Sequence, residues 1–255
     1  MSIFHALTLG LIQGVTEFLP ISSSGFLVIL PELFGWPLQS VTFDAVVHLG
    51  TLAAIIHAMR SDIASAWAHQ RRTFWWITAA TVPVLAAGFV MELVLQVNVR
   101  STSIVAISFV LWGIVLLLAD RSAKTVSDTV QTVGWKRSLV IGLAQVIALI
   151  PGTSRSGITI SAGLFGGLSR QTATTFSFLL GIPTLFVAGM YSLFEAVRNP
   201  TTEAFWPLAV GAVTAFLSCL VTVRAVRAWL DRRGTYAGLA VFRLVVGLLL
   251  FAWVL

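Results

Sequence analysis

Long apolar runs separated by short polar segments dominate the chain. Six of these runs are long and apolar enough to cross a hydrocarbon core of about 30 Å as helices. They cover residues 43–59, 74–92, 102–119, 173–194, 206–223 and 236–254. The pattern therefore predicts an all-α polytopic membrane protein.

Two further apolar regions, 3–38 and 138–169, are each interrupted near the middle by polar residues. The first breaks at Leu19-Pro-Ile-Ser-Ser-Ser-Gly25 and the second at Pro151-Gly-Thr-Ser-Arg-Ser-Gly157. The arms on either side of these breaks are too short to cross the core. Each region therefore predicts a re-entrant helical hairpin. Its irregular tip is tolerated at membrane depth only where protein or a wet cavity surrounds it.

Basic residues gather in alternate connections and give the spans an orientation. The rich segments contain Arg60, Arg71, Arg72, Arg121, Lys124, Lys136, Arg137, Arg170, Arg224, Arg227, Arg232 and Arg233. The positive-inside rule places such segments in the cytoplasm. The opposite loops hold only Arg100 and Arg198, and residues 1–59 hold no Lys or Arg. We therefore expect the first hairpin to enter from outside, the second to enter from the cytoplasm, and both termini to lie outside.

The two halves of the chain also resemble each other. At an offset of 132, six residues recur, namely Gly10, Leu11, Gln13, Ser22, Ser24 and Gly25 as Gly142, Leu143, Gln145, Ser154, Ser156 and Gly157. Each half, 1–119 and 138–255, would hold one hairpin and three spans. An odd number of spans inverts the second copy, which is the inverted-repeat plan with a site near the midplane. The alternative is chance similarity between apolar sequences.

Composition supports a membrane location and narrows the partners. Of the 255 residues, 57% are hydrophobic and 10% are charged, whereas a soluble domain has about 25% charged residues. Membrane lipids are therefore expected partners. The net charge of +6 is assigned to cytoplasmic loops, so nucleic acid is not an expected partner. The single cysteine, Cys219, excludes an internal disulfide.

Glu17 and Arg155 are the ionisable residues nearest the two predicted tips. A charge at bilayer depth costs about 2.5–3.5 kcal/mol even on the lenient insertion scale, so such residues usually face a cavity and a partner. Two interpretations remain. The two side chains form a buried ion pair that only locks the hairpins together, or they belong to a binding or catalytic site.

The tips also carry many hydrogen-bond donors, which favours the second interpretation. Six hydroxyl groups come from Ser22, Ser23, Ser24, Thr153, Ser154 and Ser156. Gly25 and Gly157 allow close backbone approach, and helix N-termini are expected after both tips. Hydroxyls, exposed N–H groups and a guanidinium together make a phosphate-type anion site. A carboxylate beside an anion must hold a metal or move a proton, so the tips predict phosphoryl chemistry or metal-assisted binding.

Four other polar residues in or near the apolar regions need an explanation, namely Gln13, Asp44, His48 and Arg243. Gln13 and Glu17 are spaced i, i+4 on one helix face and can share a cation or a water. Asp44 and His48 have the same spacing, and a pair at the helix end explains them better than a role in the site. Arg243 lies in the last span, where it either extends to the interface or pairs internally.

The motifs resemble those of a known family. Gln-Gly-Val-Thr-Glu-Phe-Leu-Pro-Ile-Ser-Ser-Ser-Gly at 13–25 and Pro-Gly-Thr-Ser-Arg-Ser-Gly at 151–157 are similar to the two signature motifs of the bacterial undecaprenyl-diphosphate phosphatases, also known for bacitracin resistance. The resemblance covers essentially the whole chain. It implies an inner-membrane, divalent-cation-dependent enzyme, with Mg²⁺ or Ca²⁺ as the cation. Its site opens to the periplasm, and it removes the terminal phosphate of undecaprenyl diphosphate, the cell-wall lipid carrier. A homodimer is compatible with it.

The resemblance also implies roles for individual residues. The metal-binding pair of the family falls on Gln13 and Glu17, the nucleophilic serine on Ser23, and the phosphate-binding arginine on Arg155. The family histidine falls on Phe26, which can neither accept a proton nor coordinate a metal. Glu17 could replace that histidine, directly or through water, and so could His48 if the first span packs against the tip. Otherwise turnover is reduced or lost.

Three functions compete at this point. The leading hypothesis is a lipid-diphosphate phosphatase. The second is a transporter or flippase of a phosphorylated lipid or anion, because broken helices in inverted repeats are transporter architecture and Phe26 weakens the catalytic case. The third is an ion channel, which is disfavoured because Glu17 and Arg155 at one constriction would favour opposite ions.

Overall fold

In the part of the chain that the computed structural model describes, every regular element is a helix. It describes all residues except 70, 92–100, 199–203, 233 and 255, so the end of the predicted span 74–92, Arg100 and Arg233 lie outside the described residues. The helices are α1 (Ile3–Thr16), α2 (Ser23–Phe34), α3 (Val41–Ala58), α4 (Arg60–His69), α5 (Arg71–Phe89), α6 (Thr102–Ser122), η2 (Val130–Thr132), α7 (Gly134–Gln145), η3 (Val146–Leu149), α8 (Arg155–Phe165), α9 (Arg170–Arg198), α10 (Phe205–Asp231) and α11 (Ala237–Val254).

Five of the described helices are long and apolar enough to cross a membrane, namely α3, α6, α9, α10 and α11. Each coincides with a predicted span, which confirms the all-α polytopic fold class. The sixth predicted span, 74–92, coincides with α5. This helix is less apolar because it begins with two arginines, Arg71 and Arg72, and contains three threonines.

The two interrupted regions form pairs of short helices. In the first, α1 and α2 are separated by a turn over 17–22, and in the second, α7 and η3 are separated from α8 by residues 150–154. With 14 residues, α1 is only about 21 Å long at 1.5 Å per residue, which is short of a hydrocarbon core. The two turns meet, because the Ser156 hydroxyl donates to the Leu19 carbonyl at 2.8 Å. We call residues 17–25 the first tip and residues 150–157 the second tip, so that each includes its turn and the first residues of the helix that follows.

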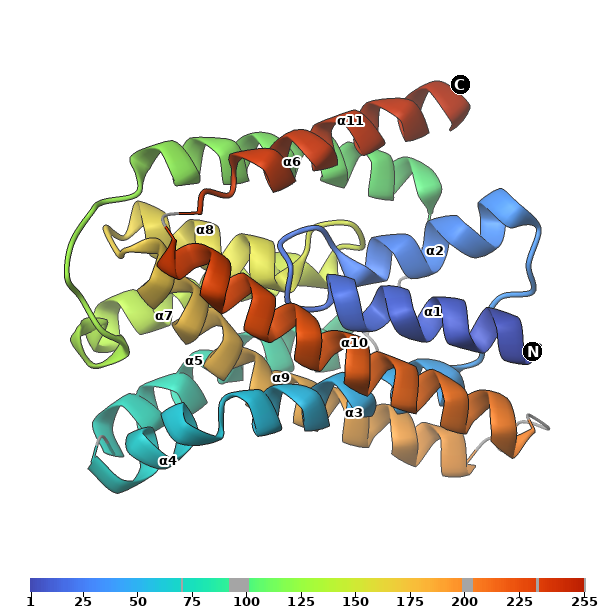
Figure 1. The fold of residues 1–255 in the computed structure, drawn as a ribbon, viewed down its shortest axis with the longest axis horizontal. Coiled ribbons are helices and arrows are strands. Elements are labelled where there is room, and N and C mark those ends of the chain that lie inside the picture. The colour runs from blue at the N-terminus through green and yellow to red at the C-terminus, as the bar shows by residue number, and fades with distance from the viewer. Residues whose placement is uncertain (70, 92–100, 199–203, 233, 255) are drawn as a thin grey trace.

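The chain termini and the helix ends that carry basic residues lie at opposite ends of the molecule (Figure 1). Both chain termini lie at one end, where α1 starts and α11 finishes (Figure 1). The helix ends that carry Arg60, Arg121 and Arg170 lie at the other end. This arrangement matches the two groups of connections predicted from the basic residues. The division into two inverted repeats, 1–119 and 138–255, stays a prediction.

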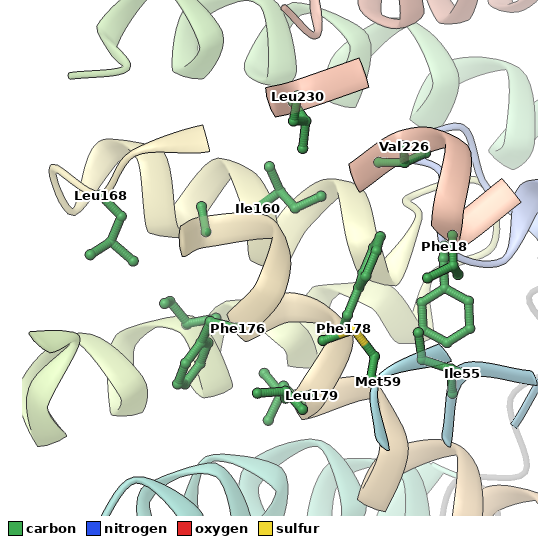
Figure 2. Packing of buried hydrophobic residues seen from close by; sticks show 14 of the residues in the cluster. Phe18, Ile55, Met59, Ile160, Leu168, Phe176, Phe178, Leu179, Val226 and Leu230 are labelled. Carbon is green, nitrogen blue, oxygen red and sulfur yellow. The ribbon is translucent and has the colours of Figure 1, made fainter. Parts of the chain in front are cut away.

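A cluster of buried apolar side chains fixes the first tip against the central helix α9. Figure 2 shows Phe18 beside Phe178, with Ile55 and Met59 of the α3 end below them. The Phe18 and Phe178 rings pack edge to face with centroids 5.2 Å apart, and both side chains are fully buried. Since Phe18 directly follows Glu17, this packing holds the glutamate backbone in place.

Candidate functional site

The two tips share one local conformation. Ser22 and Ser154 are the N-caps of α2 and α8, with φ of 77° and 72°, and they are the only non-glycine residues with positive φ among the described residues. Each side-chain oxygen accepts a hydrogen bond from the backbone N–H three residues later, at Gly25 and Gly157. The matching geometry occurs at positions 132 residues apart. Residues in such sparsely populated conformations cost about 1–3 kcal/mol each and cluster at functional sites.

Glu17 is the centre of the polar contacts between the tips. It is 7% exposed, and its Oε2 accepts hydrogen bonds from Ser23 Oγ at 2.7 Å and from Gln13 Nε2 at 3.0 Å. Its other oxygen, Oε1, lies 3.3 Å from Nη2 of Arg155. The structure therefore brings together the four residues that the sequence assigned to catalysis and metal binding.

The Arg155 guanidinium is held on both sides by α9 and the first tip. Its Nη1 donates to the Ser177 carbonyl at 3.3 Å, and its guanidinium carbon lies 5.0 Å from the Phe18 ring centroid. A side chain at Gly181 would clash, because a Cβ there would be 2.2 Å from Nη1. The Arg155 Nε is buried and has no hydrogen-bond partner among the described residues. It is therefore a donor left over for a ligand.

His48 lies close to the same carboxylate. Its Nδ1 is 2.7 Å from the Asp44 carbonyl, and its Nε2 is 3.9 Å from Glu17 Oε2. A carbonyl oxygen only accepts, so Nδ1 carries the proton and Nε2 carries the lone pair in the neutral ring. The helix-end contact expected from the spacing is present, through the backbone of Asp44. It also directs the basic nitrogen of His48 to the Glu17 side.

The donor set near Glu17 is small for a metal. No group of three or more His, Cys, Asp and Glu side chains that could hold a metal occurs among the described residues. However, Oε1 of Gln13 is fully buried and has no hydrogen-bond partner in that part of the chain. This orphaned oxygen beside a carboxylate fits a hard cation, provided that other oxygen ligands come from a bound phosphate.

The remaining predicted residues divide between local structure and the site. Ser24 is exposed, and its hydroxyl lies 3.3 Å from that of Ser22. Ser156 is used to join the tips through Leu19. The Thr153 hydroxyl is buried and has no partner among the described residues. Ser22 and Ser154 act as helix caps, so fewer hydroxyls are available to an anion than the sequence analysis expected.

Phe26 on α2 packs in an aromatic cluster with one phenylalanine of α6 and one of α11. Its ring centroid is 5.6 Å from that of Phe109 on α6 and 6.3 Å from that of Phe242 on α11. The Phe109 ring also fills the space beside Gly25, where a Cβ would be 2.5 Å from it. Phe26 therefore packs with apolar rings, and it is not among the contacts of Glu17.

Because of this packing, we expect Phe26→His to lower the unfolding temperature and to raise the phosphate release that the motif resemblance implies by no more than about 2-fold. An imidazole would replace the apolar ring that packs against Phe109 and Phe242. Initial rates and a melting curve on the purified variant test this, with Phe26→Leu as the apolar control. A gain of tenfold or more in the histidine variant alone would contradict it.

Sequence reasoning missed two contributors and left the role of a third undecided. The Ser177 carbonyl accepts a hydrogen bond from Arg155, and Gly181 leaves room for its guanidinium. Neither role can be recognised from the sequence, because the chain contains many serines and glycines. Arg243 did give a signal, as the single charge of α11. The structure shows this side chain fully buried and bonded to both tips, so it does not extend to the interface.

Comparison with known proteins gives consistent matches over nearly the whole chain. The family model described as bacitracin resistance protein BacA matches residues 6–249. Undecaprenyl-diphosphatase 1 of Pseudoalteromonas translucida is 38% identical over 97% of both chains. The undecaprenyl-diphosphatases of Chromohalobacter salexigens and Marinobacter nauticus are 38% and 36% identical, over 100% and 99% of both chains.

Proposed function

This chain belongs to the BacA family of bacitracin resistance proteins, and we propose that it hydrolyses undecaprenyl diphosphate to undecaprenyl phosphate and phosphate. The observation that carries the proposal is the contact between the Ser23 hydroxyl and Glu17, with Arg155 on the other carboxylate oxygen. A hydroxyl bonded to a buried carboxylate is an activated nucleophile. A guanidinium beside it binds the phosphate under attack.

The chemistry proceeds in two displacements. Ser23 Oγ attacks the terminal phosphorus, its proton passes to Glu17, and the bond to the bridging oxygen breaks, which releases the lipid monophosphate. Glu17 passes this proton on to His48 or to the leaving lipid phosphate and becomes a carboxylate again. Water then attacks the phosphoserine and gives a proton to Glu17, the Ser23 Oγ–P bond breaks, and Ser23 Oγ takes the proton back from Glu17 as inorganic phosphate leaves. In the alternative, Glu17 directs a water to the phosphorus in a single displacement. Both routes use the same hydrogen-bonded oxygen, and His48 Nε2 can take the proton onward from Glu17.

Substrate must open the resting ion pair before either route begins. In the structure Arg155 is neutralised by Glu17 at 3.3 Å, and an incoming diphosphate competes for the same guanidinium. Arg155 can turn to the anion while Nη1 keeps its bond to the Ser177 carbonyl. This exchange leaves Glu17 bonded to Ser23 and Gln13, in the state that accepts a proton.

A divalent cation, Mg²⁺ or Ca²⁺, would be held by Glu17 and the orphaned oxygen of Gln13 together with substrate oxygens. When bound, it neutralises charge on the diphosphate. Gln13 carries no charge, so Glu17 is the single anionic protein ligand. The hydroxyls and N–H groups of the two tips orient the phosphates.

The proposal includes a location. The connections rich in Lys and Arg favour the cytoplasm for the end of the molecule that carries Arg60, Arg121 and Arg170. The first hairpin then enters from the periplasmic side of a bacterial inner membrane, and the site opens to that side. Membrane lipids surround the chain, and a homodimer is compatible with the arrangement.

Transport is the second candidate, because short broken helices meeting at a buried ion pair are also transporter architecture. Detergent solution separates the two, since it contains no second compartment. We expect purified protein in micelles to release one phosphate for each undecaprenyl diphosphate consumed, at a rate of about 1 per second or faster. Tight binding of the lipid without phosphate release would favour the transporter.

A further inference from the structure

Arg243 is a buried cation that the proposed reaction does not use. It lies on α11 (Ala237–Val254), has 0% exposure, and is among the largest fully buried side chains of the protein. An arginine at this depth is expensive unless its donors are satisfied. Its surroundings therefore indicate what it does.

The guanidinium donates to three carbonyls from three separate segments. Nη1 donates to Pro20 at 3.1 Å, and Nη2 donates to Gly152 at 2.8 Å and to Ser108 at 3.3 Å. Pro20 belongs to the first tip, Gly152 to the second tip, and Ser108 to α6. One side chain thus joins both tips to the α6–α11 pair.

The two tip carbonyls occupy equivalent places. Pro20 and Gly152 are 132 residues apart, the offset that relates the two tips. Each lies two residues before a serine N-cap with positive φ, Ser22 or Ser154. A single guanidinium therefore binds the same carbonyl in both copies of the tip, just before the strained residue from which each helix starts.

Arg243 on α11 also packs beside an aromatic side chain of α6, Phe109. A Cβ at Gly113 would contact Arg243 and Leu244, and a Cβ at Gly247 would contact Phe109 and Val110. These reciprocal contacts pair Arg243 with Phe109, whose ring lies 5.2 Å from the guanidinium carbon. An aromatic ring therefore packs beside the first tip, and a cation bonds across both tips.

Arg243 forms no ion pair with a carboxylate within the described ranges. The tips thus hold one buried carboxylate, Glu17, against two guanidinium groups. The second charge is offset by three carbonyl oxygens and by the face of the Phe109 ring, with no carboxylate among the described residues. The formal charges of Glu17, Arg155 and Arg243 therefore sum to a positive value, which suits a bound diphosphate.

We propose that Arg243 is a positioning residue, which sets the distance between the Ser23–Glu17 pair on the first tip and Arg155 on the second tip by bridging the equivalent carbonyls of Pro20 and Gly152. Ser23 and Arg155 follow these carbonyls by three residues each, so a shift of either tip displaces a reacting group. A misplacement of about 1 Å costs about 100-fold in rate. The kinetic consequence rests on the proposed phosphatase function, whereas the bridge itself does not.

The kinetic experiment compares Arg243→Lys and Arg243→Met with the wild type in phosphate release from undecaprenyl diphosphate. Lysine keeps the charge, but its compact head cannot reproduce the planar fork that reaches three carbonyls. We expect kcat to fall about 100-fold in both variants, with KM changed less than about 3-fold. Arg227→Lys is the matched control, because this arginine on α10 pairs with Asp62 at 2.8 Å and bonds to no carbonyl of either tip. Its kcat should stay within about 3-fold of wild type.

A second readout does not depend on activity. Hydrogen exchange, followed by mass spectrometry in nanodiscs, reports opening of backbone N–H groups. Arg243→Lys should raise exchange at least about 10-fold in peptides covering 18–25 and 151–158 together, and Arg227→Lys should raise it in neither. If Arg243→Met does not fold, Arg243→Lys carries the test alone.

The outcomes separate the ideas. A wild-type kcat in Arg243→Lys would show that only the positive charge matters and would overturn the proposed bridge. Unchanged hydrogen exchange at either tip in this variant would overturn it as well. Loss of activity that only follows the folded fraction of the variants would also overturn it. A wild type without phosphate release, combined with raised exchange at both tips, would support the bridge and reject the phosphatase function.

Discussion

Glu17→Gln is expected to reduce phosphate release from undecaprenyl diphosphate about 1,000-fold, within the range that general base catalysis supplies. The carboxamide keeps the shape of the side chain but cannot take the proton of Ser23, whose hydroxyl lies 2.7 Å from Oε2. It also removes the negative charge that neutralises Arg155 in the resting site. Turnover should therefore be lost through kcat, while the freed Arg155 and the weakened cation site act in opposite directions on KM.

Glu32→Gln is the matched control for this result. Glu32 is a glutamate on α2 that accepts a hydrogen bond from Thr102 of α6 and makes no contact with Ser23. We expect it to keep at least about half of the wild-type kcat, since its loss affects one partly exposed contact. If Glu17→Gln kept more than a tenth of the activity, the proton acceptor would have to be another group, and His48 would be the first candidate.

Arg155→Lys is expected to lower kcat/KM about 100-fold, and Arg155→Met further, in the range found when a charge-stabilising donor is removed. Lysine keeps a positive charge, but it lacks the planar fork that lets separate guanidinium nitrogens bind the Ser177 carbonyl and a phosphate oxygen. It also leaves empty space beside Gly181, where the guanidinium now fits. Steady-state kinetics over a range of lipid concentrations measure the effect.

Arg170→Lys provides the control, because Arg170 opens α9 as Arg155 opens α8. Its fork binds the carboxylate and the carbonyl of Asp120, at the end of the molecule away from the tips. We expect a lower unfolding temperature but a kcat/KM within about 3-fold of wild type. If kcat/KM fell equally in Arg155→Lys and Arg170→Lys, Arg155 would contribute to protein stability and not to phosphate binding.

The sequence predicted the helices and the polar tips because both depend on local patterns. Apolar run length set the spans, and Pro with Gly set the breaks. Charge at bilayer depth identified Glu17 and Arg155, and the structure places them 3.3 Å apart. The predicted span 74–92 coincides with α5, but this helix is not among the five that are long and apolar enough to cross a membrane, so its role as a span stays a prediction.

Contacts between distant segments could not be predicted in the same way. His48 and Glu17 meet only because α3 packs beside the first tip, and periodicity does not say which helices are neighbours. The use of Ser22 and Ser154 as caps depends on a positive φ that L-residues rarely adopt. The bond pattern of Arg243 depends on two carbonyls 132 residues apart, and backbone acceptors leave no trace in side-chain identity.

The most direct test of the account measures inorganic phosphate and lipid monophosphate together, over time, with purified protein and undecaprenyl diphosphate in detergent. Wild type and Glu17→Gln are compared from parallel preparations with equal melting temperatures. The account predicts equal amounts of the two products from the wild type and about 1,000-fold slower formation of both by the variant. Equal rates from the two proteins, or no product from a folded wild type that binds the lipid, would contradict it.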